Sequence, residues 1–145
     1  MNAHLRQRSP SEVIRRGYSD EEIHNVYSLG RLFLEGGAFR RAETVFRGLI
    51  EVAPEFMLAR LGLAYVHLVA GEHETVLELS RDILRTNPTH PECMLLTVIS
   101  SLSVGDLNAA GTYLGELKDE IEAQHITDSA LIRLYRSQLV RFQSR

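Results

Sequence analysis

The fold is decided by residues 26–54, which read VYSLGRLFLEGGAFRRAETVFRGLIEVAP. The small and apolar residues of this stretch recur in phase farther along the chain. A period of 34 residues with such residues at fixed offsets is typical of a helix–turn–helix repeat. The sequence therefore predicts an all-α chain with three helical hairpins, over 23–56, 57–90 and 91–124. The glycines and prolines that mark the period are Gly37, Gly71 and Gly105, and Pro54 and Pro88.

Each marked position in the first hairpin has a packing reason. Gly30 is small, so that the second helix can approach the first closely, and Ala42 is its counterpart on that second helix. Gly37 falls in the turn, where a residue free to adopt positive φ ends the first helix. Phe46 is expected to fill the space between the helices. Pro54 should end the second helix, because proline does not continue one.

The repeat signal weakens along the chain. The second hairpin keeps the small residue, the turn glycine and the final proline, but it has His67 and Ser80 where the first has Phe33 and Phe46. The third keeps the turn glycine, has Ser101 where the first has Phe33, and lacks the final proline. Several residue classes in phase over three periods still favour one repeat architecture for the whole stretch.

Short connections rich in glycine, proline or asparagine separate the expected helices. A capping box, Ser19 to Glu22, opens the first of them, because the serine hydroxyl and the glutamate carboxylate can satisfy free backbone amides there. An earlier capping box, Ser9 to Glu12, predicts a separate short helix that ends near Arg16 and could serve as an N-terminal cap or as a dimer contact. The repeat and terminal helices are expected over 20–35, 39–52, 55–70, 73–86, 91–103, 106–124 and 128–142.

These signals divide the chain into three parts. Residues 1–22 should form a flexible segment and the short helix, and residues 23–124 the three repeats. Residues 125–145 should form a C-terminal capping helix, since a repeat array leaves the last unit with an uncovered apolar face. The apolar residues of this last helix favour a lid over a partner site.

The amino-acid composition limits which classes of function the protein can have. The chain has 145 residues, 44% of them hydrophobic and 24% charged, with a formal net charge of −3, which indicates a soluble globular domain with no drive toward nucleic acid. There is no run of about 18 apolar residues to span a membrane and no apolar core of a signal peptide near the start. Cys93 is the single cysteine, so no internal disulfide is possible. We therefore expect a cytoplasmic protein.

The sequence contains no constellation that would carry catalysis. Phosphate-binding, dinucleotide-binding and hydrolase glycine motifs are absent, and the six histidines are scattered. His67 and His73 are six residues apart, a poor helical spacing for a metal, and both are expected at the surface or in a groove. Cys93 lies in an apolar run and is expected to be a buried thiol. We predict no enzyme activity, no catalytic residues, no metal site and no cofactor.

The repeats resemble tetratricopeptide repeats, which curve so that the first helix of each hairpin lines a concave side. The resemblance implies that four positions of each first helix face this groove. The heat-shock co-chaperones of this family hold acidic tails with a carboxylate clamp, but of the clamp positions only Arg31 is basic here and Glu92 has the wrong sign. The predicted protein-binding groove consists of Tyr27, Arg31, Leu34, Leu58, Leu61, Tyr65, Leu68, Leu95, Ile99 and Leu102.

This predicted lining is unusually apolar for a solvent-facing surface. It indicates a binding surface for an apolar or amphipathic segment of a partner protein, with Tyr27 and Tyr65 as natural anchors because aromatic rings bury a large area with few torsions to freeze. Two other interpretations remain open. The predicted phase could be off by one residue, or the terminal helix could fill the groove.

A closer resemblance is carried by VYSLG at 26–30, by Gly37, Phe39, Ala42 and Val45-Phe46, and by LGLA at 61–64. These residues are similar to the first two repeats of the translocator chaperones of bacterial type III secretion. That family holds a segment of an aggregation-prone client in the concave groove, and many members dimerise through N-terminal helices. Needle-subunit chaperones of the same systems share the architecture and hold an amphipathic helix.

The resemblance implies a non-enzymatic chaperone or adaptor whose client is a secreted translocator or needle subunit, with a homodimer through the N-terminal helix as a further possibility. The alternative is a scaffold subunit of a larger assembly that uses its convex face or its terminal helix. Solubility separates the two, because a chaperone keeps an otherwise insoluble client in solution and a scaffold does not.

Overall fold

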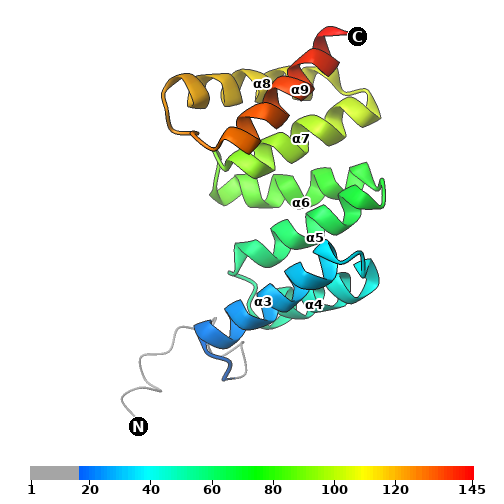
Figure 1. Ribbon diagram of the computed structural model, residues 1–145, viewed down its shortest axis with the longest axis vertical. Coiled ribbons are helices and arrows are strands. Elements are labelled where there is room, and N and C mark those ends of the chain that lie inside the picture. The colour runs from blue at the N-terminus through cyan, green and yellow to red at the C-terminus, as the bar shows by residue number, and fades with distance from the viewer. Residues whose placement is uncertain (1–16) are drawn as a thin grey trace. The chain divides into compact units, whose positions relative to one another are not determined.

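The computed structural model describes residues 17–145, and within that range it is all α-helical, with no strand. Every predicted repeat and terminal helix is present, with each end within two residues of the expected position. The short helix predicted over 9–16, and the dimer contact suggested for it, lie outside the described residues. The helices, labelled in Figure 1, are α3 (Asp20–Glu35), α4 (Phe39–Val52), α5 (Met57–Val69), α6 (His73–Thr86), α7 (Pro91–Val104), α8 (Leu107–Glu122) and α9 (Ser129–Gln143).

The turn glycines explain why the hairpins recur at a fixed interval. Gly37, Gly71 and Gly105 have φ of 80°, 76° and 84°, the left-handed region that favours glycine. The amide of the residue after each glycine donates to the carbonyl five residues earlier, at 2.8–2.9 Å, so the last turn of the helix is closed in the same way each time. The predicted role of these glycines is confirmed.

The chain forms two compact units, and the boundary between them falls within α5. Unit 1 is Met1–Val66, and in it α3 and α4 pack as a hairpin. Unit 2 is His67–Arg145, in which α7 packs against α6, α8 and α9 and α9 also contacts α8. The repeat boundaries given above from the sequence stay predictions.

In unit 1 the packing centres on Phe46, whose side chain is fully buried on α4. A Cβ added at Gly30 of α3 would lie 2.6 Å from Cε1 of this ring, and one added at Gly62 of α5 would lie 2.6 Å from the same atom. Neither helix could carry even a methyl group there without a shift of the ring. Gly30 and Phe46 therefore have the packing roles predicted for them, and Gly62 is a third member of the contact.

In unit 2 the packing centres on α7, which begins at Pro91 behind the N-cap His90. The His90 ring accepts a hydrogen bond from the Cys93 amide at 3.3 Å. From Cys93 to Val98 every residue is buried. A helix that is apolar nearly all round is expected to be buried on several sides, and here α6, α8 and α9 supply the neighbours.

Alanine substitutions at two helical glycines test the central contact of unit 1. Gly62→Ala should lower the free energy of unfolding by about 1–3 kcal/mol, because the new methyl group overpacks a buried ring. Gly48→Ala on α4 is the matched control, since a Cβ there meets no heavy atom within 4 Å. It should stabilise the protein by about 0.5–1 kcal/mol through helix propensity. Urea denaturation followed by circular dichroism measures both, and equal effects would contradict the proposed contact.

Candidate protein-binding surfaces

Tyr27 of unit 1, predicted as an anchor of the groove, lies in an aromatic cluster. Its ring centroid is 5.9 Å from that of Phe46 and 5.6 Å from that of Phe56, the latter edge-on at 77°. His24 contacts Phe56 edge-on as well, with centroids 5.0 Å apart. Edge-to-face pairs of this kind stabilise aromatic clusters. The ring of Tyr27 is therefore held in place by the chain itself and is half-buried.

Arg31 holds the hydroxyl end of Tyr27. Its Nη1 donates to the Tyr27 hydroxyl at 3.1 Å, and its Nη2 lies 3.3 Å from Oε1 of Glu35. The hydrogen bond with Tyr27 raises the pKa of Arg31 above its ordinary value, with Glu35 adding to the effect. The guanidinium is exposed. This part of α3 thus presents an ordered aromatic ring beside a fixed positive charge.

The predicted groove residues of unit 1 differ in how much surface they offer. Arg31 is exposed, whereas Leu61 is only 4% exposed and packs inside the unit. The others are half-buried: Tyr27, Leu34, Leu58 and Tyr65. Their assignment as protein-binding residues stays a prediction.

In unit 2 two of the four predicted groove residues are buried. Leu95 and Leu102 are 5% and 0% exposed, while Leu68 and Ile99 are half-buried. The helix α9 packs against α7, which carries three of these residues. Arg141 on α9 donates to the Ile99 carbonyl at 3.4 Å, and Arg145 beyond it donates to the Leu102 carbonyl at 2.7 Å.

The contacts of α9 bear on the interpretation, left open by the sequence, that the terminal helix fills the groove. Arg141 also donates to the Ser103 hydroxyl at 3.0 Å, and Phe142 lies 3.3 Å from the Cβ position of Gly111 on α8. The terminal helix thus lies against the part of α7 that carries Ile99 and Leu102. Whatever surface these two residues offer to a partner is reduced by the chain's own helix.

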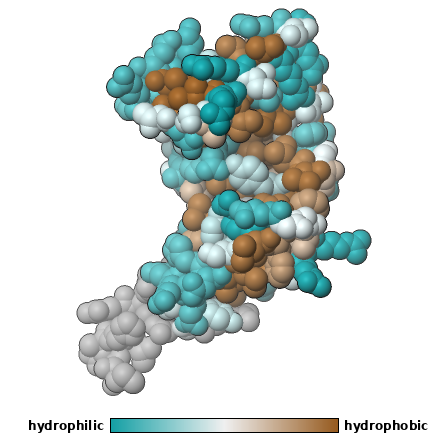
Figure 2. Space-filling view, in the orientation of Figure 1, coloured by the Kyte–Doolittle hydropathy of each residue, from teal (hydrophilic) through white to brown (hydrophobic). Residues whose placement is uncertain are grey.

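Apolar side chains outside the predicted groove are also exposed. On α3, Val26, Leu29 and Leu32 are 37%, 45% and 64% exposed, and on α9 Leu134 and Val140 are 50% and 63% exposed. Figure 2 shows that patches of hydrophobic side chains reach the surface in the view that it draws.

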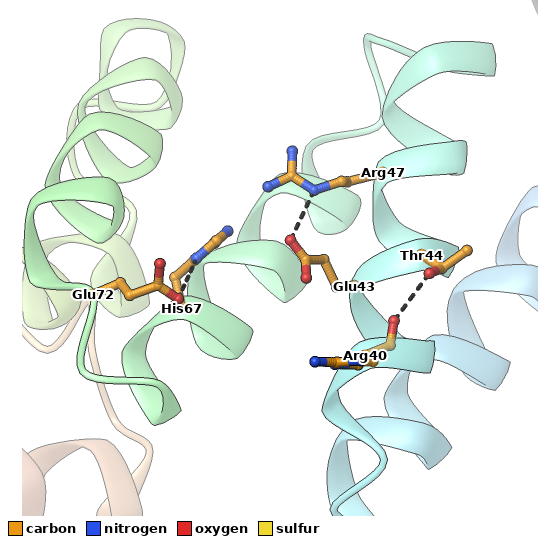
Figure 3. A network of polar contacts seen from close by, with 6 residues as sticks. All are labelled: Arg40, Glu43, Thr44, Arg47, His67 and Glu72. Atoms are coloured by element: carbon orange, nitrogen blue, oxygen red, sulfur yellow. Dashed lines mark hydrogen bonds and ion pairs between the residues drawn. The ribbon is translucent and has the colours of Figure 1, made fainter.

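Two of the polar contacts drawn in Figure 3 lie within α4. On α4, Arg47 bonds Glu43 at 2.9 Å and the Thr44 hydroxyl donates to the Arg40 carbonyl at 3.0 Å. Pairs four residues apart on an exposed helix face add only a few tenths of a kcal/mol each. They support α4 and form no site.

The prediction that His67 and His73 lie at the surface or in a groove is wrong for His67. His67, expected at the surface or in a groove, is only 7% exposed, and its Nδ1 lies 3.3 Å from Oε1 of Glu72. It is a core histidine with its polar atom directed to the turn after α5. His73 is half-buried and its Nδ1 lies 3.1 Å from the Ser100 hydroxyl.

The possible metal ligands and the thiol of Cys93 are further candidates for a chemical site. Within residues 17–145, no three histidine, cysteine or acidic side chains gather as a metal site. Cys93 is fully buried, as predicted, and burial raises the pKa of its thiol to about 12, with the negative charge of Glu92 adding to the effect. In the same part of the chain, no helix is long and apolar enough to cross a membrane.

The described residues form helix–turn–helix repeats that have left-handed glycines in the turns and partly exposed aromatic and aliphatic side chains. These features define the class of protein. No protein-family model and no curated protein matches the sequence. Solved structures do match. A type III secretion system complex from Aeromonas hydrophila superposes with a TM-score of 0.78 over 99% of this chain and 92% of that one, at 15% identity.

Two more proteins of known structure have the same fold. PcrH from Pseudomonas aeruginosa has a TM-score of 0.74 at 19% identity, over 88% of this chain and 94% of its own. PcrH has also been solved with the chaperone-binding region of PopB. The type III secretion translocator chaperone SycD of Yersinia enterocolitica has a TM-score of 0.73 at 16% identity, over 88% and 92%. The chain resembles type III secretion chaperones in fold, as the sequence predicted.

The thiol of Cys93 provides a test of unit 2 packing. With a pKa of about 12, only about 10⁻⁴ of it is thiolate at pH 8, and the thiolate is the reactive form. Ellman's reagent should therefore leave the native protein unmodified at pH 8 and react at once in concentrated guanidinium chloride. Native reaction at pH 8 at the rate of free cysteine would contradict this packing.

Proposed function

We propose that the protein is a non-enzymatic chaperone of a type III secretion system, acting in the cytoplasm on an apolar or amphipathic segment of a client protein. The observation that carries the proposal is the fold match, which spans nearly the whole chain and includes SycD and PcrH. At 15–19% identity the match shows the fold, and the function is our inference from it.

The client we propose is a secreted translocator or needle subunit. Support comes from PcrH, which has been solved with the chaperone-binding regions of PopB and of PopD. Binding would be driven by burial of apolar client surface, at about 25 cal/mol per Å². The cost of ordering the client offsets much of that gain.

We propose that the partly exposed members of the predicted groove receive the client. In unit 1 these include Tyr27, whose ring is already held by Phe46 and Phe56. An anchor that is ordered before binding loses little entropy when a partner covers it. The exposed guanidinium of Arg31 beside it would favour a client segment that carries a carboxylate.

Two leucine substitutions on α3 test the surface. Leu34 belongs to the predicted groove and Leu32, 64% exposed, does not. Leu34→Glu should weaken client binding at least about tenfold, because a carboxylate would be desolvated in the interface. Leu32→Glu makes the same chemical change two residues away and should leave binding unchanged. The measurement is the amount of soluble client, chosen from translocator and needle proteins encoded with this chain, when the two are co-expressed.

The results of these measurements distinguish a chaperone from a scaffold and test the predicted phase of α3. Circular dichroism and the melting temperature show whether each variant is folded, and Tyr65→Ala provides a second groove variant on α5. If the wild-type protein does not increase the soluble amount of any such client, the chaperone proposal fails and a scaffold role takes its place. If Leu32→Glu and Leu34→Glu weaken binding equally, the predicted phase of α3 is wrong.

A further inference from the structure

An apolar cleft of ≈ 280 Å³ opens in unit 1 between α3 and α4. Its floor includes Ile23 and Leu49, which are 2% exposed and belong to the core of the unit. Its walls include Tyr18 and Val26, which are 47% and 37% exposed. Every lining residue except Thr44 is hydrophobic or glycine, and none is charged. The cleft therefore suits an aliphatic side chain.

Gly48 of α4 lines the cleft and keeps it open. A Cβ added at this residue would meet no heavy atom within 4 Å, so the missing side chain leaves free space. An engineered apolar cavity of about 150 Å³ is large enough to bind benzene. The cleft is therefore large enough for one or two branched aliphatic side chains.

The chain enters α3 at the rim of this cleft. Gly17 has φ of 88°, in the left-handed region, which lets the backbone change direction just before the helix. Tyr18 and Ile23 occupy the two positions of a hydrophobic staple around the N-cap Ser19, a pair that fixes the angle at which a chain enters a helix. Both side chains line the cleft. Residues 1–16 therefore join the described part of the chain at the cleft.

The charges at this end of unit 1 favour a basic segment. The first turn of α3 carries three exposed acidic residues, Asp20, Glu21 and Glu22. Glu51 is exposed beside Val52 of the cleft. Of the arginines that flank the cleft residues of α4, Arg47 bonds Glu43 at 2.9 Å. The other, Arg41, lies over the Phe33 ring, 5.9 Å from its centroid. Residues 1–16 carry four arginines against one glutamate.

We propose that the chain's own N-terminal segment covers this cleft, with Val13 and Ile14 in the cleft and the arginines of the segment near the acidic first turn of α3. Val13 and Ile14 are the one adjacent pair of aliphatic residues within 1–16, four and three positions before Gly17. A chain of that length spans at most about 14 Å, so the pair can reach the cleft beside Tyr18.

The tether favours this occupant over a separate partner. A short link between a segment and its site gives an effective concentration in the millimolar range. A contact too weak to hold a free peptide therefore holds this segment, and a partner would have to displace it. None of the residues that line the cleft belongs to the predicted groove. The proposal thus goes beyond the chaperone function and holds whether or not that function is correct.

The first experiment measures disulfide formation in the full-length protein under mild oxidation. Ile14→Cys combined with Val26→Cys places one thiol on the segment and one on a wall of the cleft. Ile14→Cys combined with Ser28→Cys is the control, because Ser28 is exposed on the same helix and does not line the cleft. The first pair should form a disulfide within one chain at least about tenfold faster, since the two loops differ little in length. Cys93 is fully buried and should not react.

The second experiment uses the peptide acetyl-Ser-Pro-Ser-Glu-Val-Ile-Arg-Arg-amide, which has the sequence of residues 9–16. In a chain with Val13→Ser and Ile14→Ser it should shift the amides of Val26, Val45 and Gly48. To the wild-type chain it should bind at least about fivefold more weakly, because the chain's own segment occupies the cleft and lowers the competent fraction. Adding Gly48→Phe, whose side chain begins in open space, should fill the cleft and abolish the shifts.

Four results would overturn the proposal. They are equal oxidation rates for the two cysteine pairs, no shift of these amides by the peptide, equal binding of the peptide to both chains, and binding that Gly48→Phe leaves unchanged. Disulfides that form mainly between chains would assign the cleft to a second copy and also overturn it. Circular dichroism and the melting temperature show that each variant is folded.

Discussion

The contact on which unit 1 depends is that of one buried ring with two glycines. Phe46 on α4 occupies the space that a methyl group at Gly30 of α3 or at Gly62 of α5 would need. Because neither helix has a side chain there, both backbones can approach the ring. The same ring then supports Tyr27, which in turn contacts Phe56. The aromatic surface that we propose for client binding is thus an outward continuation of the core.

The helices and turns could be predicted from the sequence because their causes are local. A left-handed turn residue, a small residue where helices meet and a capping serine act over a few positions, and each recurs with the repeat. Ser19, for example, accepts from the Glu22 amide and Glu22 from the Ser19 amide, both at 3.1 Å. Such pairs are visible in a single sequence.

Burial of individual side chains could not be predicted in the same way, because it depends on which distant element covers a helix face. Leu102 was expected in a groove, but it is fully buried on α7. Its carbonyl accepts a hydrogen bond from Arg145, which follows α9 and lies 43 residues along the chain. His67 was expected near the surface and is buried, with its ring nitrogen near Glu72. Periodicity places a residue on a face of its helix. It does not say what packs there.

The second and third hairpins depart from the first at the positions of Phe33 and Phe46, and these departures change the packing. In the first hairpin one of these positions holds Phe46, whose side chain is fully buried against Gly30 and Gly62. In unit 2 serines occupy two such positions, Ser80 and Ser101, and both are fully buried with no hydrogen-bond partner for the Oγ among the described residues. A buried polar atom without a partner is unfavourable to stability. Ser80 and Ser101 therefore lower the stability of unit 2, because each leaves a buried hydroxyl group without a partner.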